Sequence, residues 1–236
     1  MKVAIHQPQY FPWAPYVHKV MSADIFVYLD IVQFSKNGVQ NRNQIKTAQG
    51  PLWLTVPVKH QLEQKIAQTA VADPRFARKH WKTIQYSYSK CLGFERWQEE
   101  LKALFESDFE LLVDAAIDST EWMLGKLQVN NQRLKASDLG EVKGEASQLV
   151  ASICKELKAT TYLTGTGALA YLDPADFASI NCEIQIQRWT PFSYQQTNVE
   201  RGFVPDLSAL DLLLNCPDTA RDLIAGAGSW LPLEAT

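Results

Sequence analysis

The stretch "KVAIHQPQYFPWAPYVHKVMSADIFVYLD", residues 2–30, contains two strand signals on either side of a helix signal. The short apolar run Lys2–Ile5 is typical of a buried strand, and the β-branched and aromatic run Ile25–Leu29 predicts a second one that ends at Asp30. Between them, Tyr16–Ser22 has the spacing of a helix. This order predicts a βαβ unit, which is how a parallel sheet begins.

The middle of the chain has a different character. The residues "NQIKTAQGPLWLTVPV", 43–58, place an Ala-Gln-Gly turn signal between two extended pieces and predict a hairpin, to which residues 66–71 would add a third strand. Residues 74–129 carry three successive helical patterns and predict a helical insert. Residues 130–145 are polar and contain glycine, so we expect a mobile loop there.

Alternation of helix and strand returns near the C-terminus. The segment "EASQLVASICKELKA" predicts a helix, "TYLT" and "EIQIQRW" predict strands, and Asp206 or Ser208 would cap a final apolar helix. We therefore predict an α/β fold: one Rossmann-like domain over residues 1–236, with a mainly parallel sheet, a β-hairpin and a helical insert.

The composition of the chain limits the partners it can bind and the cell compartment in which we expect it. The formal net charge of −3 gives no general attraction to nucleic acid or to anionic membranes. The four cysteines are far apart and have no metal-ligand or disulfide spacing, and the sequence has neither a secretion signal pattern nor a run long enough to span a bilayer. We expect a cytoplasmic protein with no membrane span, which binds a small molecule and not nucleic acid.

Three predicted strands end in polar loops. In open parallel sheets, ligands bind beyond the carboxyl ends of the strands. The loop after Ile5, the residue Asp30 and the turn at residues 164–167 should therefore meet at one rim. His6, His18 and Lys19 supply donors that suit a phosphate or a developing oxyanion. In the alternative interpretation, the aromatic residues of this loop form a small satellite core.

The residues also resemble a known family. The stretch from His6 to Val58, together with "YLTGTGALAYLD" and "VPDLSALDLLLN", is similar to the WbqC-like family of bacterial proteins over nearly the whole chain. That resemblance implies a role in the biosynthesis of surface polysaccharides such as O-antigen, where nucleotide-linked amino sugars are modified. In a second likeness, "PYVH" resembles the HxGH motif of nucleotidyltransferases, but only His18 matches it.

Other polar residues have two interpretations each. Arg42 and its asparagine neighbours can contact an anion or a sugar, or they can form an ordinary loop. Asp30 can act as a base, a magnesium ligand or a ribose contact, or it can cap the next turn. The "TGTG" turn lacks the spacing of a dinucleotide fingerprint or a P-loop, but can present N–H and hydroxyl groups.

We therefore predict a group-transfer enzyme, a transferase or ATP-dependent ligase, that acylates the amine of an amino sugar or related precursor. Candidate cofactors are ATP with magnesium or an acyl donor; the alternative is a non-catalytic binding or scaffold protein of the same pathway. The expected catalytic residues are His6, His18 and Asp30. The expected substrate-binding residues are Gln7, Tyr10, Trp13, Lys19, Gln33, Asn41, Arg42, Asn43, Lys46, Thr164, Gly165 and Gly167, and no metal ligand is assigned.

Overall fold

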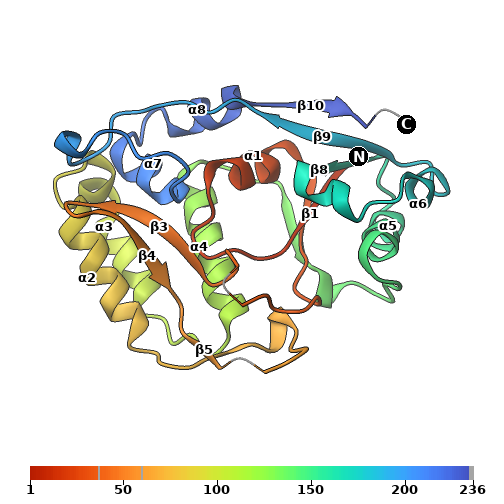
Figure 1. Cartoon of the computed structure of the whole chain (residues 1–236), viewed down its shortest axis with the longest axis horizontal. Helices are drawn as coiled ribbons and strands as arrows, with labels where there is room; N and C mark the ends of the chain where they lie inside the picture. The colour runs from red at the N-terminus through yellow and green to blue at the C-terminus, as the bar shows by residue number, and fades with distance from the viewer. Residues whose placement is uncertain (37, 60, 234–236) are drawn as a thin grey trace.

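A six-stranded sheet forms the centre of the protein (Figure 1). The structure is a computed structural model and describes residues 1–36, 38–59 and 61–233. The strand order is β10-β9-β8-β1-β2-β7. The bounds are β1 Lys2–His6, β2 Ile25–Tyr28, β7 Gln132–Lys135, β8 Thr161–Thr164, β9 Glu183–Trp189 and β10 Gly228–Pro232.

The chain leaves the central strand β1 in two directions. It proceeds first through β2 to β7 on one side, and then returns to β8, β9 and β10 on the other. All neighbouring pairs are parallel except β9 with β10. Numbered along the chain, this is the order 3-2-1-4-5-6 of doubly wound dinucleotide-binding sheets. The structure confirms the predicted α/β class with its mainly parallel sheet.

Helices cover both faces of this sheet. On one face, α1 (Ala14–Ser22), α4 (Leu112–Lys126), α7 (Ala209–Asn215) and α8 (Ala220–Ala227) contribute to the larger apolar core. On the other face, α5 (Ala146–Glu156) and α6 (Pro174–Ala178) build a second core. Strand β1 serves both cores, because successive side chains of a strand point to opposite faces.

The predicted hairpin and helical insert are both present. Strands β3 (Arg42–Thr47) and β4 (Gly50–Thr55) pair antiparallel. Gly50 adopts a φ of 113°, which a residue with a side chain rarely does, and so permits the tight turn. Helices α2 (Phe76–Tyr88), α3 (Leu92–Phe105) and α4 follow, and α2 and α3 pack beside the hairpin (Figure 1).

The loop between β1 and α1 does not lie over the sheet. Its middle is bound to the hairpin and to the segment before it, because the Asn43 side-chain amide donates to the Phe11 carbonyl over 2.8 Å and the Tyr10 N–H donates to the Gln40 carbonyl. The Phe11 N–H donates to the Ser119 hydroxyl of α4, and Tyr10 and Phe11 are both buried. This part of the loop therefore belongs to the larger apolar core and not to a separate satellite core.

Two predictions about secondary structure were wrong. Residues 130–145 contain the edge strand β7, where the Nε–H of Arg133 is shared between the two carboxylate oxygens of Glu121. A polar sequence is compatible with this position, because an edge strand has only one neighbouring strand and its side chains are only partly buried. Residues 66–71 form a 3-10 turn (Ile66–Gln68) and a short strand β6 (Ala70–Val71), which pairs with β5 (Val58–Lys59) away from the hairpin.

No helix in the described ranges combines the length and the apolar character that crossing a membrane requires.

Two glycines provide a matched test of helix packing. A β-carbon at Gly93 in α3 would lie 2.5 Å from the Leu213 carbonyl oxygen of α7, whereas one at Gly125 in α4 would meet nothing within 4 Å. Gly93→Ala should therefore lower the free energy of unfolding by about 2–3 kcal/mol, because α3 and α7 must separate. Gly125→Ala should raise it by about 0.5–1 kcal/mol. Urea unfolding of both variants measures the difference, and equal effects would contradict this packing.

Candidate functional site

A cavity lies at the carboxyl ends of β1 and β8, where the chain direction across the sheet reverses. We call it the switch-point cavity, because ligands bind at such reversals in doubly wound sheets. Its volume is about 250 Å³. It is lined by Ile5, His6, Gln7, Lys19, Leu29, Val150, Tyr162, Thr164, Gly165, Gly167, Ala168 and Tyr171.

Among the residues that the structure describes, Lys19 of α1 is the only lysine or arginine that lines this cavity. Its side chain is 5% exposed, and among the described residues no carboxylate pairs with its ammonium group. Burial lowers the pKa of Lys19 from 10.5 to about 8, because the charged form loses its hydration. A β-carbon at Gly165 would lie 3.5 Å from Nζ, which places the ammonium beside the loop that follows β8.

No acidic residue is among those that line the cavity within the described chain. A buried cation without a counterion costs free energy, and proteins usually pair such a charge. The unpaired ammonium at this edge of the sheet therefore indicates a place for an anionic group of a ligand.

His6 ends β1 and lines the same cavity. Burial, and then the charge of Lys19, lower its pKa to about 3, so the imidazole is neutral at pH 7. Its Nδ1 lies 3.1 Å from the Gln7 carbonyl oxygen, which can only accept. Nδ1 therefore carries the proton and Nε2 keeps a lone pair. Tyr16 holds the ring by an edge contact with centroids 4.9 Å apart.

The loop after β8 forms another wall of the cavity. Thr164 is buried, and its hydroxyl accepts a hydrogen bond of 3.1 Å from the Tyr162 hydroxyl. Gly165 and Gly167 bring backbone without side chains to the cavity, and the 3-10 turn Thr166–Ala170 begins between them. The structure thus brings together six residues expected at the site: His6, Gln7, Lys19, Thr164, Gly165 and Gly167.

His18 lies elsewhere. It is in the middle of α1, not in its first turn, since α1 begins at Ala14. Its ring stacks on Trp230 with centroids 5.7 Å apart and presses against Gly228, where a β-carbon would lie 2.3 Å from the ring. The Gln187 amide donates to Nδ1 over 2.9 Å, and burial lowers the pKa of His18. In this structure His18 packs α1 against β9 and β10.

Asp30 follows the end of β2 but does not line the cavity. Its carboxylate is 1% exposed and accepts hydrogen bonds from the Ser137 N–H over 2.9 Å and from the Ser137 hydroxyl over 2.6 Å. These bonds tie the ends of β2 and β7 together. Asp30 thus holds the 3-10 turn Ala136–Asp138 that follows β7, and not the turn that follows Asp30 in the sequence, as the capping alternative had it.

The polar cluster at the hairpin also lies outside the cavity. The Asn41 amide donates to the Val56 carbonyl, and Asn43 holds Phe11 as described above. The Arg42 guanidinium lies over the Trp53 ring, 4.5 Å from its centroid, and the buried Lys46 ammonium donates to the Gly202 carbonyl. Asn41 and Arg42 therefore contact the hairpin itself, while Asn43 and Lys46 join it to the loop before α1 and to Gly202.

Three further expected site residues are dispersed. Gln33 is exposed and forms an isolated backbone bridge with Lys65. The Tyr10 hydroxyl lies 2.9 Å from Nδ1 of His80, in the core. Trp13 is 39% exposed and lines a different cavity. The described residues contain no group of three histidine, cysteine or acidic side chains that could hold a metal ion.

The family of the chain follows from comparison with known proteins. A model of the WbqC-like protein family matches residues 7–223. The chain belongs to the WbqC-like family. It is also 30% identical over 233 residues, 94% of this chain and 97% of the other, to a Mycobacterium tuberculosis protein described as the uncharacterized protein Rv1507c. No solved structure gives a significant match.

Sequence reasoning missed two tyrosines of this WbqC-like protein. Tyr162 and Tyr171 line the switch-point cavity. The alternation along "TYLT" was the available signal for Tyr162, because it lies two residues before Thr164 and so faces the same side of β8. Tyr171 follows a 3-10 turn whose direction the sequence does not define.

The electrostatics of Lys19 make a prediction about stability. Replacing an unpaired buried ammonium by an apolar side chain of similar length removes a desolvation cost. Lys19→Met should therefore raise the free energy of unfolding at pH 7 by about 3 kcal/mol, the cost that corresponds to a pKa lowered from 10.5 to about 8. Urea unfolding provides the measurement.

The matched control is Lys155→Met on the exposed side of α5, which should change stability by less than about 0.5 kcal/mol. Marked destabilisation by Lys19→Met would mean that the ammonium has a stabilising partner, and would contradict its assignment as an unpaired charge.

Proposed function

We propose that this protein is a group-transfer enzyme whose switch-point cavity holds an anionic group of the donor. The observation that carries the proposal is the buried ammonium of Lys19, which lacks a carboxylate partner among the described residues and lies beside the loop after β8. Lysine in such a position binds phosphate as a point charge. Membership of the WbqC-like family supports an acceptor from surface polysaccharide biosynthesis, with the amine of an amino sugar as the nucleophile.

The residues of the cavity suit transfer of an acyl group. The amine nitrogen forms a bond to the carbonyl carbon, and the leaving group departs with the electron pair of the broken bond. Lys19 stabilises the negative charge that develops on the leaving group, and Nε2 of His6 takes the proton that the amine loses. Because the charge of Lys19 lowers the pKa of His6, a bound anion raises it and makes His6 a better proton acceptor.

The proposal assigns anion binding to Lys19 and proton acceptance to His6, and the two roles can be tested separately. The donors to test are ATP, acyl-CoA and nucleotide sugars, in binding titrations and product assays with amino-sugar acceptors. Where magnesium accompanies a nucleotide, it would arrive bound to the phosphates. His6→Gln should retain donor binding within about threefold but lower turnover at least about a hundredfold, because glutamine cannot take a proton.

Turnover by His6→Gln at the normal rate would exclude His6 as the proton acceptor. Binding of a donor without turnover for any acceptor would favour the alternative, a non-catalytic binding or scaffold protein of the same pathway.

The pKa of Lys19 also predicts a pH dependence of anion binding. Sulfate is a suitable probe because it does not titrate near neutrality. Only the ammonium form attracts an anion, so sulfate affinity should be constant below about pH 8 and should fall above it, as the free Lys19 loses its proton. Calorimetric titrations from pH 6 to pH 10, a range chosen to bracket the pKa near 8, measure this dependence.

Lys19→Met should lower sulfate affinity at least tenfold at pH 7, as expected when a charge-assisted contact of about 1.5–3 kcal/mol is removed. The Lys155→Met control should bind sulfate normally. An unchanged affinity in Lys19→Met would refute the anion site.

A further inference from the structure

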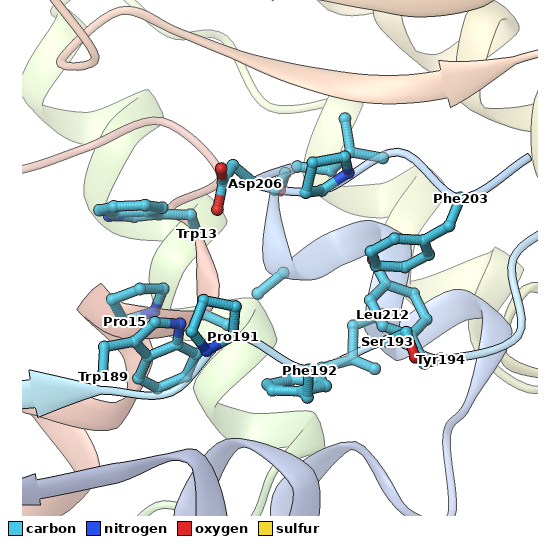
Figure 2. A pocket seen from close by; sticks show the side chains of 15 residues that line it. Trp13, Pro15, Trp189, Pro191, Phe192, Ser193, Tyr194, Phe203, Asp206 and Leu212 are labelled. Atoms are coloured by element: carbon cyan, nitrogen blue, oxygen red, sulfur yellow. The ribbon is translucent and has the colours of Figure 1, made fainter.

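A second cavity, with a volume of about 350 Å³, lies at the N-terminal end of α1, before Lys19 in the sequence. We call it the aromatic pocket (Figure 2). Five aromatic side chains line it: Trp13, Trp189, Phe192, Tyr194 and Phe203. It shares no lining residue with the switch-point cavity. Its size is in the range of small-molecule sites.

Four of these rings form a continuous wall. Trp189 and Phe192 have ring centroids 5.9 Å apart, Phe192 and Tyr194 6.1 Å, and Tyr194 meets Phe203 edge-on at 5.4 Å. The Tyr194 hydroxyl donates to the buried carboxylate of Asp211 over 2.7 Å. That bond fixes the wall in place, so a ligand would find it preformed.

Asp206 supplies the only charged side chain among the lining residues that the structure describes. It is exposed, and no hydrogen bond or ion pair of its carboxylate is found within the described chain. Its φ of 57° lies in the left-handed region, which costs free energy for a residue with a side chain. Figure 2 shows the carboxylate on the same side of the pocket as Trp13.

The positions of Trp13 and Asp206 are linked through the backbone. Trp13 forms an isolated antiparallel bridge with Ser208, two residues after Asp206, and the Ala209 N–H donates to the Pro12 carbonyl. The two side chains are thus anchored beside each other at one rim. Both are accessible, since the side chain of Trp13 is 39% exposed.

Electrostatics then decides which ligand this pocket favours. Aromatic faces carry negative potential and attract cations, and a carboxylate adds to that attraction. No lysine, arginine or histidine is among the lining residues, so nothing in the described pocket would balance an anion. We propose that the aromatic pocket binds an organic ammonium ion, with its positive charge between the aromatic faces and the Asp206 carboxylate.

The ligand proposed for the aromatic pocket is a cation, whereas the ligand proposed for the switch-point cavity is an anion. Helix α1 contributes to both cavities: Pro15 lines the aromatic pocket, and Lys19, four residues later, lines the switch-point cavity. The inference stands independently of the proposed transfer reaction, because it uses none of the residues in the switch-point cavity.

Choline and its neutral isostere 3,3-dimethylbutan-1-ol provide the decisive probes, because they have the same shape and differ in charge. Binding to the full chain is followed by tryptophan fluorescence and by ligand-detected NMR at millimolar concentrations. Choline should bind at least about fivefold more tightly than the alcohol, as expected for a cation over aromatic faces. Equal affinity of the two probes, or no binding of choline, would overturn the proposal.

Four variants locate the effect. Asp206→Asn should reduce choline affinity about fivefold and leave the alcohol unchanged, while the exposed control Asp222→Asn on α8 should alter neither. Trp13→Leu should weaken choline binding as well. Lys19→Met should bind choline normally, so that failure of the anion site and failure of this pocket are distinguishable. Unchanged choline binding in both Asp206→Asn and Trp13→Leu would refute the assignment to this pocket.

Discussion

The pairing of β1 with β8 is the constraint on which the rest of this structure depends. Strand β1 holds β2 on one side and β8 on the other, although the N-terminal ammonium of the chain and its partner Thr160 are 159 residues apart in sequence. Because both pairings are parallel, the carboxyl ends of the three strands meet at one edge. His6 and Thr164 come together there only because the chain returns to β1 after crossing the whole helical insert.

Local sequence patterns were sufficient for most of the framework. The runs at Lys2–Ile5 and Ile25–Leu29 are buried strands because apolar side chains cover both faces of a parallel sheet, and that pattern is readable without a structure. Strand β7 could not be predicted in this way. Its residues are half-buried at the sheet edge, and its Arg133 forms an ion pair with Glu121 in α4, a contact that local composition does not encode.

In the candidate site, too, the sequence was sufficient to predict some residues and not others. His6, Lys19 and the glycines after β8 were predictable as a group, because strand ends converge in this fold. His18 and Asp30 also carry polar groups that would suit a site. Tertiary contacts give them other roles: His18 stacks on Trp230, and Asp30 accepts hydrogen bonds from Ser137. Histidine and aspartate are suited to both roles, so residue type alone did not separate a ligand contact from a packing contact. Lys19 differs from His18 and Asp30 because the fold buries its charge and, among the described residues, provides no counterion.

The central claim is that the switch-point cavity binds an anion through Lys19, and direct observation of such an anion is the sharpest test. Crystals of the protein soaked in selenate would reveal its position by the anomalous scattering of selenium. The account predicts an anomalous peak in the cavity, with a selenate oxygen at hydrogen-bond distance, about 2.8 Å, from the Lys19 Nζ, and no such peak in Lys19→Met. A cavity without selenate, or a selenate that remains there in Lys19→Met, would contradict the account.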